Sequence, residues 1–167
     1  MDPLAITRTS SFSTTDPEKL KSIVRRIWWA SGLRDPDIDP KTSKGSYLDE
    51  QRGRYAFGAY DYICGIVPED IYAESKDELE KDFYGCDLCA EPGHMEELIR
   101  ELQEILPPDE VIIIEEVGGD VSWGPETEVT IITPKASKTF TPGDMNRMLN
   151  DAIRNAVSEM TGSDRSV

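Results

Sequence analysis

The stretch EVIIIEEVGGDVSWGPETEVTIITP, residues 110–134, contains two runs rich in isoleucine, valine and threonine on either side of a glycine-rich connection. Such residues favour extended backbone, and a turn-forming segment between two such runs predicts a hairpin or two neighbouring strands of one sheet. Gly118-Gly119 does not begin a phosphate-binding loop, because no Lys-Ser or Lys-Thr pair follows it and no helix is predicted there. This stretch therefore predicts part of a β-sheet.

Four segments outside this stretch predict helices. Residues 14–32, 93–110 and 139–162 carry apolar residues three and four positions apart, which places those residues on one side of a helix. Thr15 or Asp16 can cap the first of these helices. A short acidic helix is predicted at residues 75–85.

Further strands are predicted within residues 3–12, which alternate loosely between apolar and polar, and within residues 54–72, which are rich in aromatic and β-branched residues. Strands and helices are interspersed without a regular repeat. We therefore predict an α+β fold, a mainly antiparallel sheet with amphipathic helices packed on one face; a short α/β sheet is the alternative. The length of 167 residues fits a single domain, which we assign to residues 1–162, with a polar loop at about residues 34–53 and a frayed tail at residues 163–167.

The last predicted helix has a methionine-rich apolar stripe. Its members are Met145, Met148, Leu149, Ala152, Ile153, Ala156, Val157 and Met160. Thr141 and Asp144 predict a capping box at its start. Methionine adapts to irregular surroundings, so such a stripe can serve as a binding surface. Core packing is the more frequent role of an apolar stripe, and we predict it here.

Charge is unevenly distributed along the chain, whose formal net charge is −15. Residues 35–134 carry seven Lys/Arg against twenty-six Asp/Glu, whereas residues 1–34 carry six against three and residues 135–167 five against four. An acidic face can imitate a phosphate backbone or dock on a basic partner, including the basic N-terminal segment of another copy. A solvated or halophilic surface is the alternative, although it should cover both ends too. Direct nucleic-acid binding is disfavoured, because phosphates would be repelled.

Seven residues are candidates for partner binding. Four are acidic residues on the polar side of the predicted helix at 93–110, and three are a basic pair and a nearby tryptophan that could stack on a partner. They are Glu96, Glu97, Glu101 and Glu104, together with Arg25, Arg26 and Trp29. The alternative is a solvated helical face for the acids and an anchor at the edge of the core for the tryptophan.

Cysteine and histidine are concentrated in CDLCAEPGH, residues 86–94. Zinc prefers thiolate and imidazole ligands in a tetrahedron, and two cysteines separated by two residues can bind it from one turn. The order C-x2-C-x4-H resembles the first three ligands of a zinc knuckle, whose fourth ligand would fall at Ile99, which cannot bind metal. With Cys64 as a substitute, the candidate is a structural zinc site of Cys64, Cys86, Cys89 and His94. The alternative is ordinary core and loop residues.

The chain has a single histidine and lacks the motifs of nucleophilic catalysis and of phosphate or dinucleotide binding. We therefore predict a non-enzymatic protein that acts through protein–protein contacts, as a structural or assembly component; a viral origin and a homo-oligomer are options. One alternative is an acidic inhibitor or DNA mimic that blocks a nucleic-acid-binding protein. The other is a small carboxylate-dependent enzyme, with Glu115, Glu116 and Asp120 as candidate groups.

No apolar run is long enough to cross a bilayer, and the N-terminus lacks the basic-then-apolar pattern of a signal peptide. Three cysteines are too few for a disulfide framework. These features predict a cytoplasmic protein without membrane contact, or a virion protein if the chain is viral.

Overall fold

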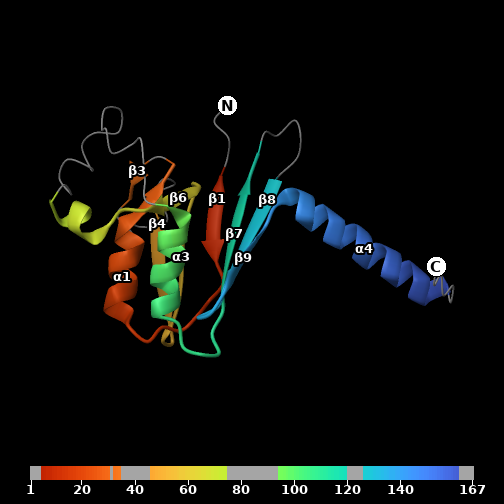
Figure 1. The fold of residues 1–167 in the computed structure, drawn as a ribbon, viewed down its shortest axis with the longest axis horizontal. Helices are drawn as coiled ribbons and strands as arrows, with labels where there is room; N and C mark the ends of the chain where they lie inside the picture. Colours follow the sequence, from red (N-terminus) through yellow and green to blue (C-terminus); the bar gives the residue numbers. More distant parts are fainter. Residues whose placement is uncertain (1–4, 31, 35–45, 75–93, 120–125, 162–167) are drawn as a thin grey trace.

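The structure of the chain is a computed structural model. The described residues are 5–30, 32–34, 46–74, 94–119 and 126–161. They form a six-stranded sheet and a three-stranded sheet, both antiparallel, with helices packed on the larger sheet (Figure 1). The predicted α+β class is confirmed.

The stretch at residues 110–134 lies in the larger sheet. The strands of this sheet, in spatial order, are β4 (Ser46–Gln51), β5 (Arg54–Ala59), β1 (Ile6–Thr9), β7 (Ile112–Gly118), β8 (Glu126–Ile132) and β9 (Ser137–Phe140). β7 and β8 pair in an unbroken antiparallel register from Ile112 opposite Ile132 to Gly118 opposite Glu126. β1 lies between β5 and β7, so the N-terminal strand joins the two hairpins into one sheet.

The first helix is shorter than predicted. α1 covers Pro17–Arg26 and is capped by Asp16, whose side chain accepts a hydrogen bond from the backbone N–H of Lys19 at 2.9 Å. The next residues form β2 (Ile27–Trp29), the central strand of the smaller sheet, between β3 (Gly32–Leu33) and β6 (Ile63–Ile66). Isoleucine and tryptophan also suit a strand, so pairing with β6 decides the conformation of a segment that has helical apolar spacing.

The predicted polar loop at residues 34–53 is wrong over its second half. β4 pairs with β5 from Ser46 opposite Ala59 to Gln51 opposite Arg54, across a two-residue turn with positive φ at Arg52 (55°) and Gly53 (77°). Two positive φ angles match a type I′ turn, whose twist suits a two-residue hairpin. β4 is a polar strand at the sheet edge, so it lacks the apolar signal of a buried strand. Residues 35–45 lie outside the described residues.

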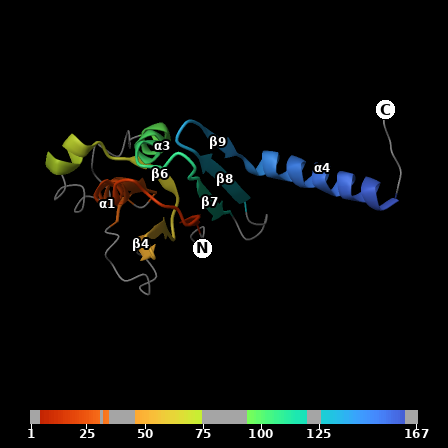
Figure 2. The same ribbon diagram turned by 90° about the horizontal axis from the view of Figure 1, so that it is seen from below.

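α1 and α3 (Met95–Glu104) lie side by side on one face of the larger sheet (Figures 1 and 2). Their inward side chains and the sheet residues beneath them form the main core. It includes Phe12, Leu20, Ile23, Val24, Phe57, Leu98, Leu102, Ile105, Ile112, Ile114 and Ile132. The helix predicted at residues 93–110 and its inward stripe are confirmed, while the helix predicted at residues 75–85 lies outside the described residues.

α4 (Pro142–Thr161) projects away from the sheet (Figures 1 and 2). Its capping box is confirmed: the Thr141 N–H donates to Asp144 Oδ2 at 3.0 Å, and the Asp144 N–H donates to Thr141 Oγ1 at 3.3 Å. None of its residues is buried, so the prediction that its apolar stripe packs in the core is wrong. The physical reason is its point of attachment: one residue, Thr141, separates α4 from the edge strand β9, and the helix runs on past the sheet edge.

Candidate functional site

The α4 stripe, defined as the eight apolar residues between Met145 and Met160, is exposed along most of its length. The exposed fractions are 52% for Met148, 59% for Leu149, 51% for Ile153, 52% for Val157 and 87% for Met160. Five of the eight exposed large hydrophobic residues in the described part of the chain therefore lie on this one helix. Clustered apolar exposure of this kind is typical of an interaction surface.

The stripe consists of two adjacent rows, each with a spacing of four residues. The bulky row is Met145, Leu149, Ile153 and Val157, and the notched row is Met148, Ala152, Ala156 and Met160. Residues four apart lie one above the other on a helix, so each row forms a ridge. The two alanines make the middle of the notched row a shallow depression beside the bulky row.

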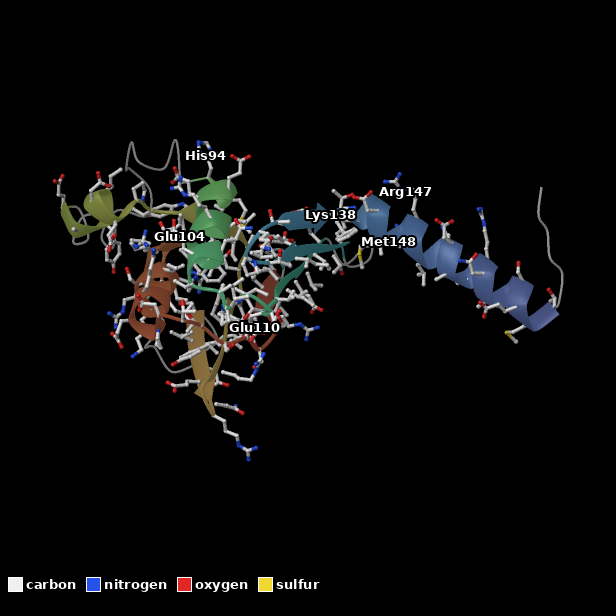
Figure 3. All side chains as sticks on the ribbon, turned by 60° about the horizontal axis from the view of Figure 1, so that its bottom comes forward. His94, Glu104, Glu110, Lys138, Arg147 and Met148 are labelled. Atoms are coloured by element: carbon white, nitrogen blue, oxygen red, sulfur yellow. The ribbon has the colours of Figure 1, made fainter. Side chains whose placement is uncertain are left out.

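A hollow of about 310 Å³ lies where α4 meets β9, lined by Lys138, Phe140, Asp144, Arg147, Met148 and Asp151. Lys138, Arg147 and Met148 lie together at this junction, far from His94 at the start of α3 (Figure 3). Arg147 pairs with Asp144, and Lys138 Nζ lies 4.9 Å from the centre of the Phe140 ring. The side of α4 that meets β9 therefore carries Asp144, Arg147 and Asp151 together with one residue of the stripe, Met148.

Two of the predicted partner-binding residues are buried, so their assignment is corrected. Trp29 is 0% exposed and belongs to the core, and Arg26 is 2% exposed. Arg26 Nη1 donates to the carbonyl oxygen of Val67 at 2.9 Å and to Glu101 Oε1 at 3.1 Å, and Nη2 also pairs with Glu101. The guanidinium thus links α1, α3 and the end of β6 instead of facing a partner.

The other predicted partner-binding residues lie at or near the surface. Glu96, Glu104 and Arg25 are exposed and Glu97 is half-buried. Lys19 Nζ donates to Glu104 Oε2 at 2.5 Å, and this hydrogen bond lowers the pKa of Glu104 and raises the pKa of Lys19. Two of the four α3 glutamates therefore form ion pairs with α1, which neutralises part of the predicted acidic face.

Glu115 and Glu116, candidates for a carboxylate-dependent enzyme, do not converge. Successive residues of a strand point to opposite faces of the sheet. Glu115 Oε2 accepts from Arg8 Nε at 2.6 Å, whereas Glu116 Oε1 accepts from the Ile63 N–H at 2.8 Å and from Thr7 Oγ1 at 3.2 Å. Burial raises the pKa of Glu116, and its hydrogen bonds join β7 to β1 and β6. Asp120 lies outside the described residues.

The zinc site remains a prediction, because Cys86 and Cys89 lie outside the described residues. Cys64 is exposed on β6, and His94 is exposed at the N-terminal end of α3. Desolvation and the nearby carboxylates of Asp61 and Glu116 raise the pKa of Cys64, which disfavours the thiolate that zinc requires. Within the described ranges, no three His, Cys, Asp or Glu residues come together as a metal site.

Comparison with known protein families, with curated proteins and with solved structures finds no match for this chain. None of the helices in the described part combines the length and hydrophobicity needed to cross a bilayer. Within the described part of the chain, the α4 stripe holds most of the exposed large hydrophobic residues, and the functional assignment starts from it. The sequence signal for it was present as an amphipathic, methionine-rich helix, but that signal does not distinguish a core helix from an exposed one.

Proposed function

We propose that this chain is a non-enzymatic protein that acts through protein–protein contacts, as a structural or assembly component, and that α4 is its contact element. The observation that carries this proposal is the exposure of the α4 stripe on a projecting helix: Leu149, Ile153 and Val157 are each more than half exposed. Most of the stability of a helix in a protein comes from packing of its apolar face. A partner that covers the stripe would stabilise the helix and bury the apolar surface together.

The free energy gained by burying the stripe is comparable to the cost of association. Burying the exposed half of an aliphatic side chain contributes roughly 1 kcal/mol, so the five exposed residues of the stripe contribute about 5 kcal/mol from this chain alone. Association costs roughly 4–15 kcal/mol in lost freedom, and the partner's own apolar surface adds to the gain. The expected contact is therefore reversible and dependent on concentration.

The internal ion pairs favour contact through α4 over mimicry of nucleic acid. Glu110 pairs with Arg54 at 3.1 Å and Glu115 with Arg8 at 2.6 Å, in addition to the two α3 glutamates that pair with α1. These carboxylates are engaged within the chain, so fewer are available to imitate phosphates. α4 itself carries three acidic and two basic residues and is nearly neutral.

The test is capture of partners by the full chain from an extract of the source cells, compared between wild type, Ile153→Glu and Ser158→Glu. Both substitutions add one negative charge at an exposed position of α4, but Ile153 lies on the stripe and Ser158 on the opposite side. The captured proteins, including other copies of the chain, should be lost with Ile153→Glu and retained with Ser158→Glu. The same set captured by all three chains would contradict the role of α4, provided circular dichroism shows equal folding.

A further inference from the structure

We infer that the partner of α4 is a second copy of this chain, and that the two α4 helices pack antiparallel about a two-fold axis between Ala152 and Ile153. This inference rests on the proposed function, because it requires α4 to be the contact element. It specifies that function by naming the occupant of the stripe and the register in which it binds.

The positions of the stripe are symmetric about the midpoint between Ala152 and Ile153. In an antiparallel two-fold pair centred there, each residue is level with the residue at the mirrored position of the other copy. Met145 is then level with Met160, Met148 with Val157, Leu149 with Ala156 and Ala152 with Ile153. Every apolar position of one helix thus meets an apolar position of the other over the whole length of the stripe.

Side-chain size gives a second reason for this register. Leu149 and Ile153 of the bulky row come level with Ala156 and Ala152 of the notched row of the other copy. Large residues opposite small ones interdigitate, and alanines at the centre allow two helices to approach closely. In a parallel pair each residue is level with itself, so Leu149 meets Leu149 and Ala156 meets Ala156. That arrangement places bulk against bulk and gap against gap.

The charge distribution favours the antiparallel pair for an independent reason. Residues 35–134 carry the excess acid. The acidic bodies of two copies, meaning the part of each chain outside α4, therefore repel each other at short range. A helix of 20 residues is about 30 Å long, and the antiparallel arrangement places the two bodies at opposite ends of the pair. This separation exceeds the screening length of about 8 Å at physiological salt. The nearly neutral α4 is therefore a segment through which two acidic copies can meet.

Cysteine cross-linking of the full chain tests the register. Residue 153 lies next to the two-fold axis, so Ile153→Cys should form a covalent dimer under mild oxidation. Leu149 lies about 10 Å along the axis from Leu149 of the other copy, seven residues at 1.5 Å each, which is too far for a disulfide. Leu149→Cys alone and Ala156→Cys alone should therefore give roughly tenfold less α4-linked dimer than Ile153→Cys, whereas an equal mixture of the two should form a mixed dimer.

Mass spectrometry of the linked peptides separates these products from any bond made by Cys64, Cys86 or Cys89. Sedimentation of Ile153→Glu and Ser158→Glu gives a second readout, the dimer dissociation constant. Ile153→Glu should raise the dimer dissociation constant more than about tenfold and Ser158→Glu less than about twofold. A covalent dimer of Leu149→Cys with itself would indicate parallel packing and overturn the inference.

The outcomes also separate this inference from the proposed function. If purified wild type is a monomer at all accessible concentrations, but a different protein is captured and lost with Ile153→Glu, the proposed function stands and the second copy is wrong. If neither self-association nor capture responds to Ile153→Glu, both fail. Equal dimer dissociation constants for Ile153→Glu and Ser158→Glu would show contact elsewhere on the chain and would overturn the inference; they would overturn the proposed function too if capture is equally unaffected.

Discussion

Replacing Glu110 with glutamine should lower the free energy of unfolding by about 2 kcal/mol near neutral pH, and the loss should shrink as the solution is acidified. Glu110 Oε2 accepts hydrogen bonds from the Ser13 hydroxyl at 2.5 Å and from the Ser13 N–H at 2.9 Å. Arg54 donates to both carboxylate oxygens, at 3.1 and 3.2 Å. These donors, the Ser13 hydroxyl foremost, lower the pKa of Glu110 from 4.5 to about 2.

The magnitude follows from this pKa difference. One pKa unit corresponds to 1.36 kcal/mol, so a fall from 4.5 to about 2 corresponds to about 3 kcal/mol. The side chain of Glu110 is 15% exposed but that of Arg54 is 47% exposed, so solvent screening reduces the value to about 2 kcal/mol. Because the folded pKa lies below the unfolded one, this stabilisation is complete above about pH 4.5 and is lost as the pH falls through about 2.

Urea unfolding, followed by the fluorescence of the buried Trp28 and Trp29, measures the effect at a series of pH values for wild type and Glu110→Gln. Glu104→Gln is the matched control: it removes the same charge from an ion pair with Lys19 whose side chains are 53% and 38% exposed. The control should cost less than about 1 kcal/mol. The reasoning is refuted if Glu110→Gln costs no more than Glu104→Gln, or if its cost is the same at acidic and neutral pH.

Three further experiments test the packing. Leu98→Ala should lower the free energy of unfolding by about 3 kcal/mol because Leu98 is fully buried, whereas Leu149→Ala should change that of dilute, monomeric protein by less than about 0.5 kcal/mol. Urea unfolding compares the two variants, and equal costs would show that α4 is packed. Gly58→Ala should lower the melting temperature by several degrees, because its Cβ would lie 2.3 Å from a backbone carbonyl oxygen of β1. Arg26→Met should lower the free energy of unfolding by about 3 kcal/mol by leaving Glu101 without its cation, and adding Glu101→Leu should restore much of the loss. An Arg26→Met variant as stable as wild type would show that the pair does not stabilise the fold.

Local pattern was sufficient for the elements that carry a strong apolar pattern of their own. α3 has its apolar residues on one side and ends before Pro107, and β7 and β8 are β-branched runs that pair with each other. β4 was missed because an edge strand can be polar, and its only local signal was the turn at Arg52 and Gly53. Such a strand is specified by its pairing with β5, which a linear pattern does not contain.

The candidate site was predicted only in part. Sequence spacing identified the α4 stripe but assigned it to the core, and it assigned Arg26 and Trp29 to the surface although both are buried. Arg26 is buried because Glu101 and the carbonyl of Val67, 75 and 41 residues away, satisfy its donors. An arginine can be buried when such partners exist, and they are brought together by the fold.

The sequence by itself determined that residues 142–161 form an amphipathic helix: the Thr141 and Asp144 capping box starts it, and apolar residues at helical spacing line one side. Only the tertiary structure decided that this side is exposed. α1 and α3 already cover the core face of the sheet, and α4 leaves the edge strand β9 after a single residue, Thr141. The physical reason is that amphipathicity requires an apolar side to be covered but does not specify whether the cover comes from the same chain or from another.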